Sequence, residues 1–289
     1  MDADLELQRA ILDIGIPPRP EILAHLEAEA QKESPDYREI ERLISADVGI
    51  SAALIKTINS PFYGLRTKVS SVHQAISLLG MSSVTRVVTG MALRTIAAGA
   101  NLVDIESHLE ASAQMALVTG YIAKKLSGVD SEQAFTFGLF QNCGTLLLMA
   151  RRPGYKKILE LAQRTPEKLL THTEIDQMGV SHASIGSLMA KEWGLGESIT
   201  EAIWYHHDYG EFMEQHIKKL STEKLNLAET QALVALGLLA ERAIYWHAGF
   251  DQTAEWKAGG QIALDYFGFT PAAYQEIVED VQGLLAPTH

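Results

Sequence analysis

The chain has 289 residues, of which 47% are hydrophobic and 21% are charged. This suffices for one large domain or two packed subdomains and excludes a compositionally disordered chain. The formal net charge is −12, and the basic residues form only short pairs such as Lys124–Lys125. A surface that binds a phosphate backbone or an anionic membrane would need clustered Lys and Arg. We therefore expect neither nucleic acid nor a membrane as a partner.

Breakers and capping residues divide the N-terminal part into short helices. The first residues read Met-Asp-Ala-Asp-Leu-Glu, which is too acidic for a signal peptide. Gly and Pro interrupt the chain over 15–20, and Ser34-Pro35 gives an N-cap followed by proline at the first helical position. Apolar residues then recur at three- and four-residue spacing from Leu43 to Ile58. The pattern predicts short helices up to a boundary near Gly99–Asp104.

Longer amphipathic helices are predicted after this boundary, beginning with one over 104–126. Ser198-Ile-Thr-Glu201 fits a capping box, and Thr270-Pro271 begins the last helix with a cap and a proline. The sequence shows no period-2 strand between turn signals and no apolar run near the ~18 residues that span a bilayer. We therefore predict an all-α protein without a transmembrane segment, in which an N-terminal helical bundle (1–103) packs on a C-terminal helical domain (104–289).

A long apolar helix is expected over 137–148, with the amides Gln141 and Asn142 at its centre. Leaving a buried amide unpaired costs on the order of 1–3 kcal/mol, so we expect a polar group to face them. The next residue, Cys143, is the only cysteine of the chain, which excludes an internal disulfide and suits a reducing cytosol. We expect a cytoplasmic protein in which this thiol is buried and structural.

Three of the ten histidines form a suggestive pattern. His182 begins a helix, whereas His206 and His207 are adjacent near the end of the helix that starts at Ser198. Adjacent helical residues point about 100° apart, so the last two cannot both face one point unless the helix end is distorted. Asp208 is the only carboxylate near them in sequence, although magnesium and manganese prefer carboxylates. Hydrogen-bonded core residues, a regulatory metal site and a catalytic site all stay open.

Several segments of the chain carry a family resemblance. They are Ile16–Glu21, Ile44–Asp47, the run from Ala53 to Gly64, Ser70–Gly80, and His182-x-x-x-Gly186 up to Trp193 followed by His206-His207. Together they resemble the HD-related output domain family, HDOD, over residues 12–210. The most specific motif consists of Asn59, Ser60, Pro61, Phe62, Tyr63 and Gly64. The resemblance implies an all-helical bacterial protein, with an HD-like C-terminal domain, related to the HD and HD-GYP metal-dependent phosphohydrolases.

The resemblance also implies where a metal site would lie and how it has changed. Active HD-GYP relatives hydrolyse cyclic di-GMP at a metal site with the ligand order His, His-Asp, His, His-His, Asp. Amides stand in place of the His-Asp pair, and an amide oxygen is a neutral, weak ligand. We therefore expect a vestigial site with no catalytic residue, no cofactor and no metal. Its residues are Ala111 (for the first histidine), Gln141, Asn142, His182, His206 and His207, and the three histidines are the ligands if any metal binds.

Three functions follow as hypotheses. The favoured one is a non-catalytic bacterial signal-transduction module that acts through contacts with other signalling proteins in trans. The second is a metal-dependent phosphohydrolase for a nucleotide or cyclic dinucleotide with an altered ligand set. The third is a sensor whose vestigial pocket holds a cyclic nucleotide or another small anion, since protonated histidines can contact phosphate. The sequence leaves the partner, the input signal and the oligomeric state open.

Overall fold

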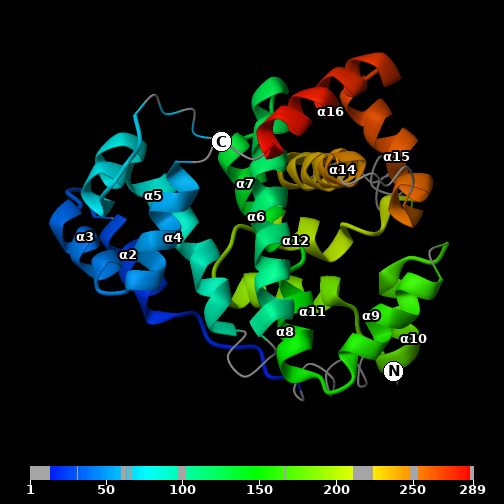
Figure 1. Ribbon diagram of the computed structural model, residues 1–289, viewed down its shortest axis with the longest axis horizontal. Coiled ribbons are helices and arrows are strands. Elements are labelled where there is room, and N and C mark those ends of the chain that lie inside the picture. Colours follow the sequence, from blue (N-terminus) through cyan, green and yellow to red (C-terminus); the bar gives the residue numbers. More distant parts are fainter. Residues whose placement is uncertain are drawn as a thin grey trace. The chain divides into compact units, whose positions relative to one another are not determined.

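The computed structural model describes residues 14–30, 32–59, 63, 65, 67–96, 102–165, 167–210, 224–247 and 253–286. Within these ranges every regular element is a helix (Figure 1), which confirms the expected all-α class. None of the described helices is both long and apolar enough to cross a membrane.

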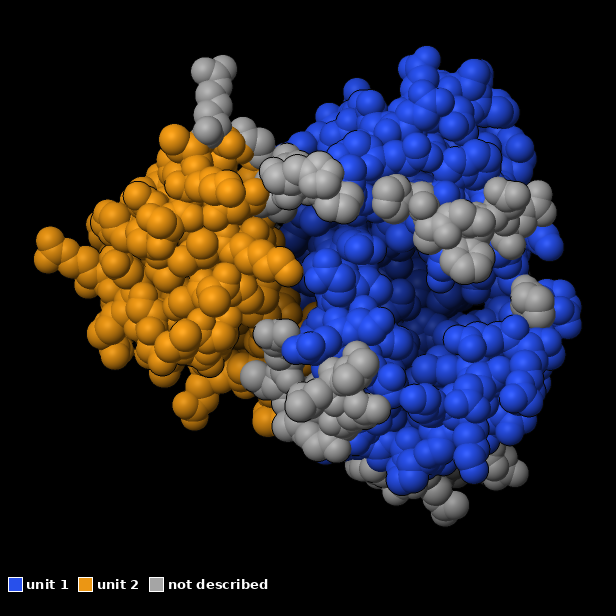
Figure 2. All heavy atoms as spheres, viewed as in Figure 1, with its two compact units in different colours: residues 1–17, 97–289 blue, residues 18–96 orange. Residues whose placement is uncertain are grey.

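The chain divides into two compact units (Figure 2). Unit 2 comprises Pro18–Ile96, and unit 1 comprises Met1–Pro17 together with Ala97–His289. Residues 97–101, at which the predicted boundary begins, lie outside the described residues. The division after residue 103 therefore stays a prediction.

Unit 2 contains α2 (Glu21–Ala30), α3 (Tyr37–Ser45), α4 (Val48–Ile58) and α5 (Val72–Ile96). The start expected at Ser34-Pro35 is wrong: the side chain of Asp36 accepts hydrogen bonds from the backbone N–H groups of Arg38 and Glu39 and caps α3. A carboxylate within reach of two free amide groups is a strong N-cap. Helix α5 is interrupted at Gly80, whose φ of 73° is left-handed and therefore favours glycine.

Asn59 fastens the segment that follows α4. Its amide group donates to the carbonyl oxygens of Ile55 at 2.9 Å and Val69 at 2.8 Å, and its side-chain oxygen accepts from the Val69 backbone N–H at 2.7 Å. Of the other motif residues, Tyr63 is described, whereas Ser60, Pro61, Phe62 and Gly64 lie outside the described residues. The motif therefore begins with an asparagine that ties together backbone ten residues apart.

Unit 1 is built from ten described helices. They are α6 (Leu102–Lys125), α7 (Ser131–Phe140), α8 (Cys143–Arg151), α9 (Tyr155–Arg164), α10 (Leu170–Met178), α11 (His182–Glu192), α12 (Glu197–Tyr205), α14 (Lys224–His247), α15 (Ala254–Phe267) and α16 (Pro271–Leu285). In Figure 1, the long helix α6 runs between α14–α16 at the top of the view and α8–α10 at the bottom. Thr270 caps α16 ahead of Pro271 as expected, but the cap of α12 is Gly196, because the Ser198 hydroxyl donates to Glu229 instead.

Glycines bring α8 and α11 into backbone contact. A Cβ atom on Gly144 would lie 2.0 Å from the carbonyl oxygen of His182, so only glycine fits there. On the facing helix, a Cβ atom on Gly186 would lie 3.1 Å from the backbone nitrogen of Gly144. The thiol of Cys143 is fully buried beside this contact, with Sγ 3.5 Å from the Gly186 oxygen, which confirms that it is buried. The contact places the start of α8 directly against the start of α11.

Candidate functional site

A cavity of about 640 Å³ lies within unit 1 (Figure 2). Its wall is formed by α6, the junction between α7 and α8, α9–α10, the start of α11, the end of α12, α14 and the start of α15. All six residues predicted from the sequence lie in this wall, although they come from four separate places in the chain: Ala111, Gln141, Asn142, His182, His206 and His207.

The amides reach the cavity because the expected continuous helix is broken. Helix α7 ends at Phe140 and α8 begins at Cys143, so Gln141 and Asn142 occupy the junction and not a helix centre. The prediction of one helix over 137–148 is therefore wrong. The side-chain oxygen of Gln141 is buried and has no hydrogen-bond partner among the described residues. It lies against α14, where a Cβ atom on Gly237 would come within 3.0 Å of it.

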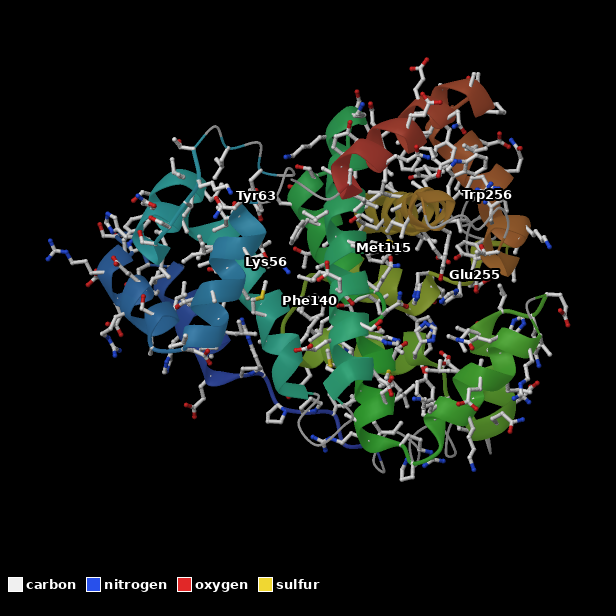
Figure 3. All side chains as sticks on the ribbon, viewed as in Figure 1. Lys56, Tyr63, Met115, Phe140, Glu255 and Trp256 are labelled. Atoms are coloured by element: carbon white, nitrogen blue, oxygen red, sulfur yellow. The ribbon has the colours of Figure 1, made fainter. Side chains whose placement is uncertain are left out.

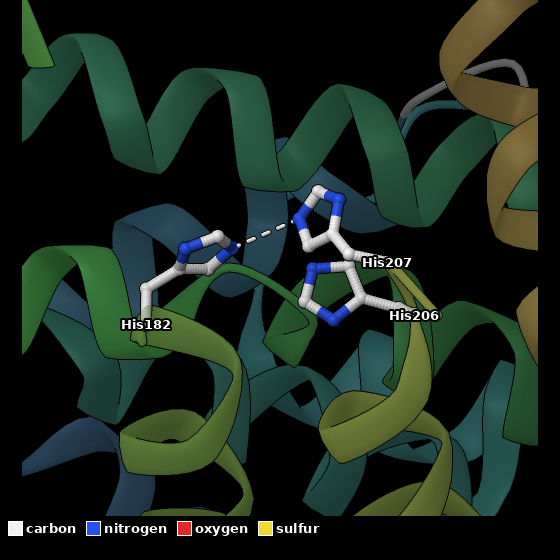
Figure 4. A group of neighbouring side chains, drawn as sticks. All are labelled: His182, His206 and His207. Atoms are coloured by element: carbon white, nitrogen blue, oxygen red, sulfur yellow. Dashed lines mark hydrogen bonds between the residues drawn. The ribbon is translucent and has the colours of Figure 1, made fainter. Parts of the chain in front are cut away.

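The two adjacent histidines share one side of the cavity because α12 ends just before them. Tyr205 is the last residue of α12, and His206 is its C-cap, with a ψ of −6°. The rings of His206 and His207 lie 4.1 Å apart between centroids, and the His182 ring lies 5.3 Å and 4.9 Å from them (Figure 4). The distorted helix end that the sequence required for convergence is thus present.

Each of the three rings has its Nδ1 atom turned toward an oxygen. His182 Nδ1 lies 2.7 Å from the Glu174 carboxylate, and His206 Nδ1 lies 2.7 Å from the carbonyl oxygen of Ile203. Carboxylates and carbonyls only accept hydrogen bonds, so we assign the proton of both rings to Nδ1. His207 Nδ1 lies 3.8 Å from Glu255. In their neutral forms, both rings therefore carry the lone pair on Nε2.

The Nε2 atoms converge at the centre of the cluster. His182 Nε2 lies 3.1 Å from His207 Nε2, and one candidate ligand atom from each ring lies within 4.8 Å of the others. His206 Nε2 is buried, points toward the other two rings (Figure 4), and has no partner within the described ranges. Because unpaired buried acceptors are rare in native proteins, this convergence indicates a place for a ligand.

Burial keeps two of these imidazoles neutral. Burial, together with the neighbouring His182, lowers the pKa of His206 to about 3. Burial, followed by the neighbouring His206 and His182, lowers the pKa of His207 well below its usual value. Neutral imidazoles coordinate transition metals, whereas imidazolium ions are needed to attract phosphate. The cluster at neutral pH is therefore suited to a metal and not to an anion.

Glu174 is a site residue that the sequence analysis missed. Its carboxylate is fully buried and accepts hydrogen bonds from the Tyr155 hydroxyl and from the backbone N–H of His182 at 2.9 Å, in addition to His182 Nδ1. A carboxylate behind a histidine fixes the ring and its tautomer. No sequence motif connects α10 with α11, and the burial that distinguishes Glu174 is visible only in the structure.

The opposite wall adds two more carboxylates that lay outside the predicted site. Glu241 of α14 and Glu255 of α15 both line the cavity (Figure 3 labels Glu255). Burial and the neighbouring Glu255 raise the pKa of Glu241 to about 8, and burial also raises the pKa of Glu255. Lys168 is the only lysine or arginine among the described lining residues, and it is paired with Asp176. The described wall therefore offers an anion no unpaired lysine or arginine.

The donor set decides which metal the residues fit. Magnesium and manganese prefer carboxylates, but Ala111 offers a methyl group, and Gln141 and Asn142 offer neutral amides. Three imidazoles whose Nε2 atoms converge are a donor set that zinc accepts, with a fourth position open. The three converging imidazoles thus fit a zinc-like transition metal.

The helical architecture and the histidine cluster define an all-α protein of the HD-related class. The HDOD domain family matches residues 16–209, and the chain belongs to this family. The sequence resemblance over residues 12–210 is thereby confirmed.

Relatives share this fold at low sequence identity. An uncharacterized protein of Treponema pallidum (strain Nichols) is 26% identical over 206 residues, which make up 68% of this chain but 39% of that protein. An HDOD domain protein of unknown function from Geobacter sulfurreducens covers 99% of this chain and 98% of its own, with 17% identity and a TM-score of 0.66. A candidate signal transduction protein from Marinobacter aquaeolei VT8 covers 96% and 62%, with 20% identity and a TM-score of 0.66. The chain thus spans less than half the length of the curated relatives that it matches.

Proposed function

We propose that this chain is a non-catalytic regulatory module of bacterial signal transduction that acts through contacts with other signalling proteins. The observation that carries the proposal is the identity of three residues in the wall of the cavity. There, Ala111, Gln141 and Asn142 present a methyl group and two amides where a hydrolytic relative needs a histidine and a His-Asp pair. By the family resemblance, such a site would lack the anionic ligand that holds a hydrolytic metal.

The charge of the described wall also argues against hydrolysis. A phosphate ester carries negative charge, which positive groups must balance as the bond breaks. Here the only lysine in the described part of the wall is paired with Asp176, so a phosphate would find no free lysine or arginine there. The substrate of a phosphohydrolase is therefore disfavoured.

Exposed apolar side chains support the part of the proposal that concerns protein contacts. Among the described large apolar residues, Tyr37, Val48 and Leu78 of unit 2 are 53%, 81% and 58% exposed. Exposed apolar surface marks sites of protein contact when it is contiguous. The fold likeness to the Marinobacter signal transduction protein agrees with such a role, and a cytoplasmic location fits it.

A hydrolysis assay tests the proposal. The native chain should release no product from nucleotides or cyclic di-GMP with manganese or magnesium. The matched comparison is the triple variant Ala111→His, Gln141→His, Asn142→Asp. It restores three metal ligands of the active HD-GYP relatives and should gain manganese binding. Turnover by the native chain that disappears in His206→Ala would contradict the proposal and favour a phosphohydrolase.

A second candidate function is supported by the convergent Nε2 atoms: the module binds a zinc-like metal through His182, His206 and His207 as its regulatory ligand. Elemental analysis of protein purified without chelators should then find about one metal per chain, as expected for one four-coordinate site. His108 lies in the same wall with Nδ1 3.2 Å from the Asp104 carbonyl, so His108→Ala is the matched control. A nucleotide sensor is the remaining alternative, and a thermal shift with cyclic di-GMP but not with zinc would favour it.

A further inference from the structure

A fully buried carboxylate, that of Glu174, lies behind the histidine cluster, and its basic partner among the described residues is the His182 imidazole, 2.7 Å away. The three donors that reach Glu174 are the Tyr155 hydroxyl and the backbone and ring N–H groups of His182. An ionised carboxylate in the protein interior is costly unless an opposite charge lies close to it. In the described part of unit 1 no lysine or arginine is paired with Glu174. A cation bound at His182 Nε2, on the far side of the ring, would supply this charge.

A second carboxylate lies near His207, whose Nδ1 is buried and has no hydrogen-bond partner among the described residues. Glu255 Oε1 lies 3.8 Å from His207 Nδ1, while His207 Nε2 lies 3.1 Å from His182 Nε2. Both side chains are largely buried, with 11% and 14% exposed. Glu255 lies on α15 and lines the cavity, beyond residues 16–209, which the family matches. Two carboxylates therefore lie beside the Nδ1 atoms of two different rings of the cluster.

We propose that Glu174 and Glu255 are the outer carboxylate partners of a three-imidazole site for a divalent transition-metal cation, and that they supply the negative charge which Asn142 does not carry. Three neutral imidazoles leave both charges of such a cation uncompensated, and two carboxylates balance them. Both residues act through Nδ1 of a histidine, so they are positioning residues and not ligands. The inference rests on the second candidate function, the three-histidine metal site.

The geometry separates these two residues from other acidic groups of the chain. Outer partners of metal-bound histidines accept the Nδ1 proton and raise the basicity of the ligating nitrogen, and their loss costs about 10–100-fold in metal affinity. The Glu174 carboxylate already lies within hydrogen-bond distance of His182 Nδ1. The distance from Glu255 Oε1 to His207 Nδ1 would have to shorten by less than about 1 Å to enter the usual N–H···O range of about 2.7–3.2 Å. A bound cation would polarise His207 and favour this approach.

Zinc titration of the full chain against a chromophoric chelator tests the inference. The variants are Glu174→Gln and Glu255→Gln, since glutamine keeps an oxygen that can accept the Nδ1 proton but carries no charge. Each should weaken zinc binding about 10-fold or more. Glu160→Gln, which changes an exposed carboxylate on α9, is the matched control and should bind zinc like the native chain. If Glu174→Gln does not fold, the zinc affinity of Glu255→Gln decides whether the inference holds.

Cobalt substitution adds a readout that a purely structural role would not give. The visible cobalt spectrum of both glutamine variants should keep the native band shape, because the ligands are unchanged, whereas His206→Ala should alter it. Native zinc affinity in both variants would overturn the inference and leave the metal site standing. A changed cobalt spectrum would overturn the assignment as outer partners. Failure of the native chain to bind zinc would remove the metal site itself.

Discussion

His182 Nε2 lies 3.1 Å from His207 Nε2, although the two residues are 25 positions apart in the chain. The first ring is carried by the start of α11 and the second by the turn after α12. Their approach depends on two features: the close packing of α8 against α11, and the end of α12 at Tyr205. Both features can be tested without knowing the ligand.

Gly144→Ala should destabilise the protein strongly. The added methyl group would lie 2.0 Å from the carbonyl oxygen of His182, so α8 and α11 would have to separate. Overpacking of this kind costs typically about 1–3 kcal/mol and occasionally more. Urea unfolding followed by circular dichroism measures it. Gly283→Ala on α16, where no atom lies within 4 Å of the new Cβ, is the control and should be neutral or slightly stabilising. Equal stability of the two variants would contradict the packing argument.

Tyr155→Phe should lower stability by leaving the buried Glu174 carboxylate with one donor fewer. Hydrogen bonds to charged groups contribute about 1.5–3 kcal/mol, and the Tyr155 ring itself is almost fully buried, so the change removes only the hydroxyl. Thermal unfolding of both proteins gives the difference. In the control Tyr121→Phe, the lost hydroxyl is an exposed donor to Asp280, and its melting temperature should stay close to native. A native melting temperature for Tyr155→Phe would show that the hydroxyl contributes nothing.

Glu241→Gln should change how stability depends on pH. Burial and the neighbouring Glu255 raise the pKa of Glu241 from 4.5 to about 8 in the folded chain. A group whose folded pKa is raised favours the protonated folded state, so its contribution is fully present below pH 4.5 and is lost as the pH rises through 8. Relative to the variant, the native melting temperature should therefore fall between these values. Melting curves across this range, recorded with a chelator, test it. Parallel pH profiles would contradict the assignment.

Asn59→Ala should destabilise unit 2, because three backbone groups lose their side-chain partner. Each unsatisfied buried group costs about 1–3 kcal/mol, less where water reaches it. Asn59→Asp keeps the acceptor for the Val69 N–H and loses both donors, so its loss of stability should be intermediate. Hydrogen exchange at the Val69 amide of the full chain is the direct readout. Unchanged protection in Asn59→Ala would contradict the role of this side chain.

The sequence by itself determined the helical class, the family and six of the residues around the cavity. Helix periodicity and the Thr270-Pro271 start depend on neighbours within about one turn, and such local terms are visible in sequence. The three histidines and two amides were recognised through motifs within the family-matched residues 16–209. Another predicted helix start was wrong because a nearby hydrogen-bond acceptor, the side chain of Asp36, caps the helix instead.

Tertiary structure decided whether these residues meet and what surrounds them. The break at Gln141–Asn142, the end of α12 at Tyr205 and the contact at Gly144 are set by packing between helices. Glu174, Glu241 and Glu255 have no motif of their own, and only the fold brings them beside the cluster. Their chemistry comes from burial, which displaces the pKa values of His206 and Glu241 in opposite directions. Sequence spacing cannot express burial, because it depends on contacts between helices far apart in the chain.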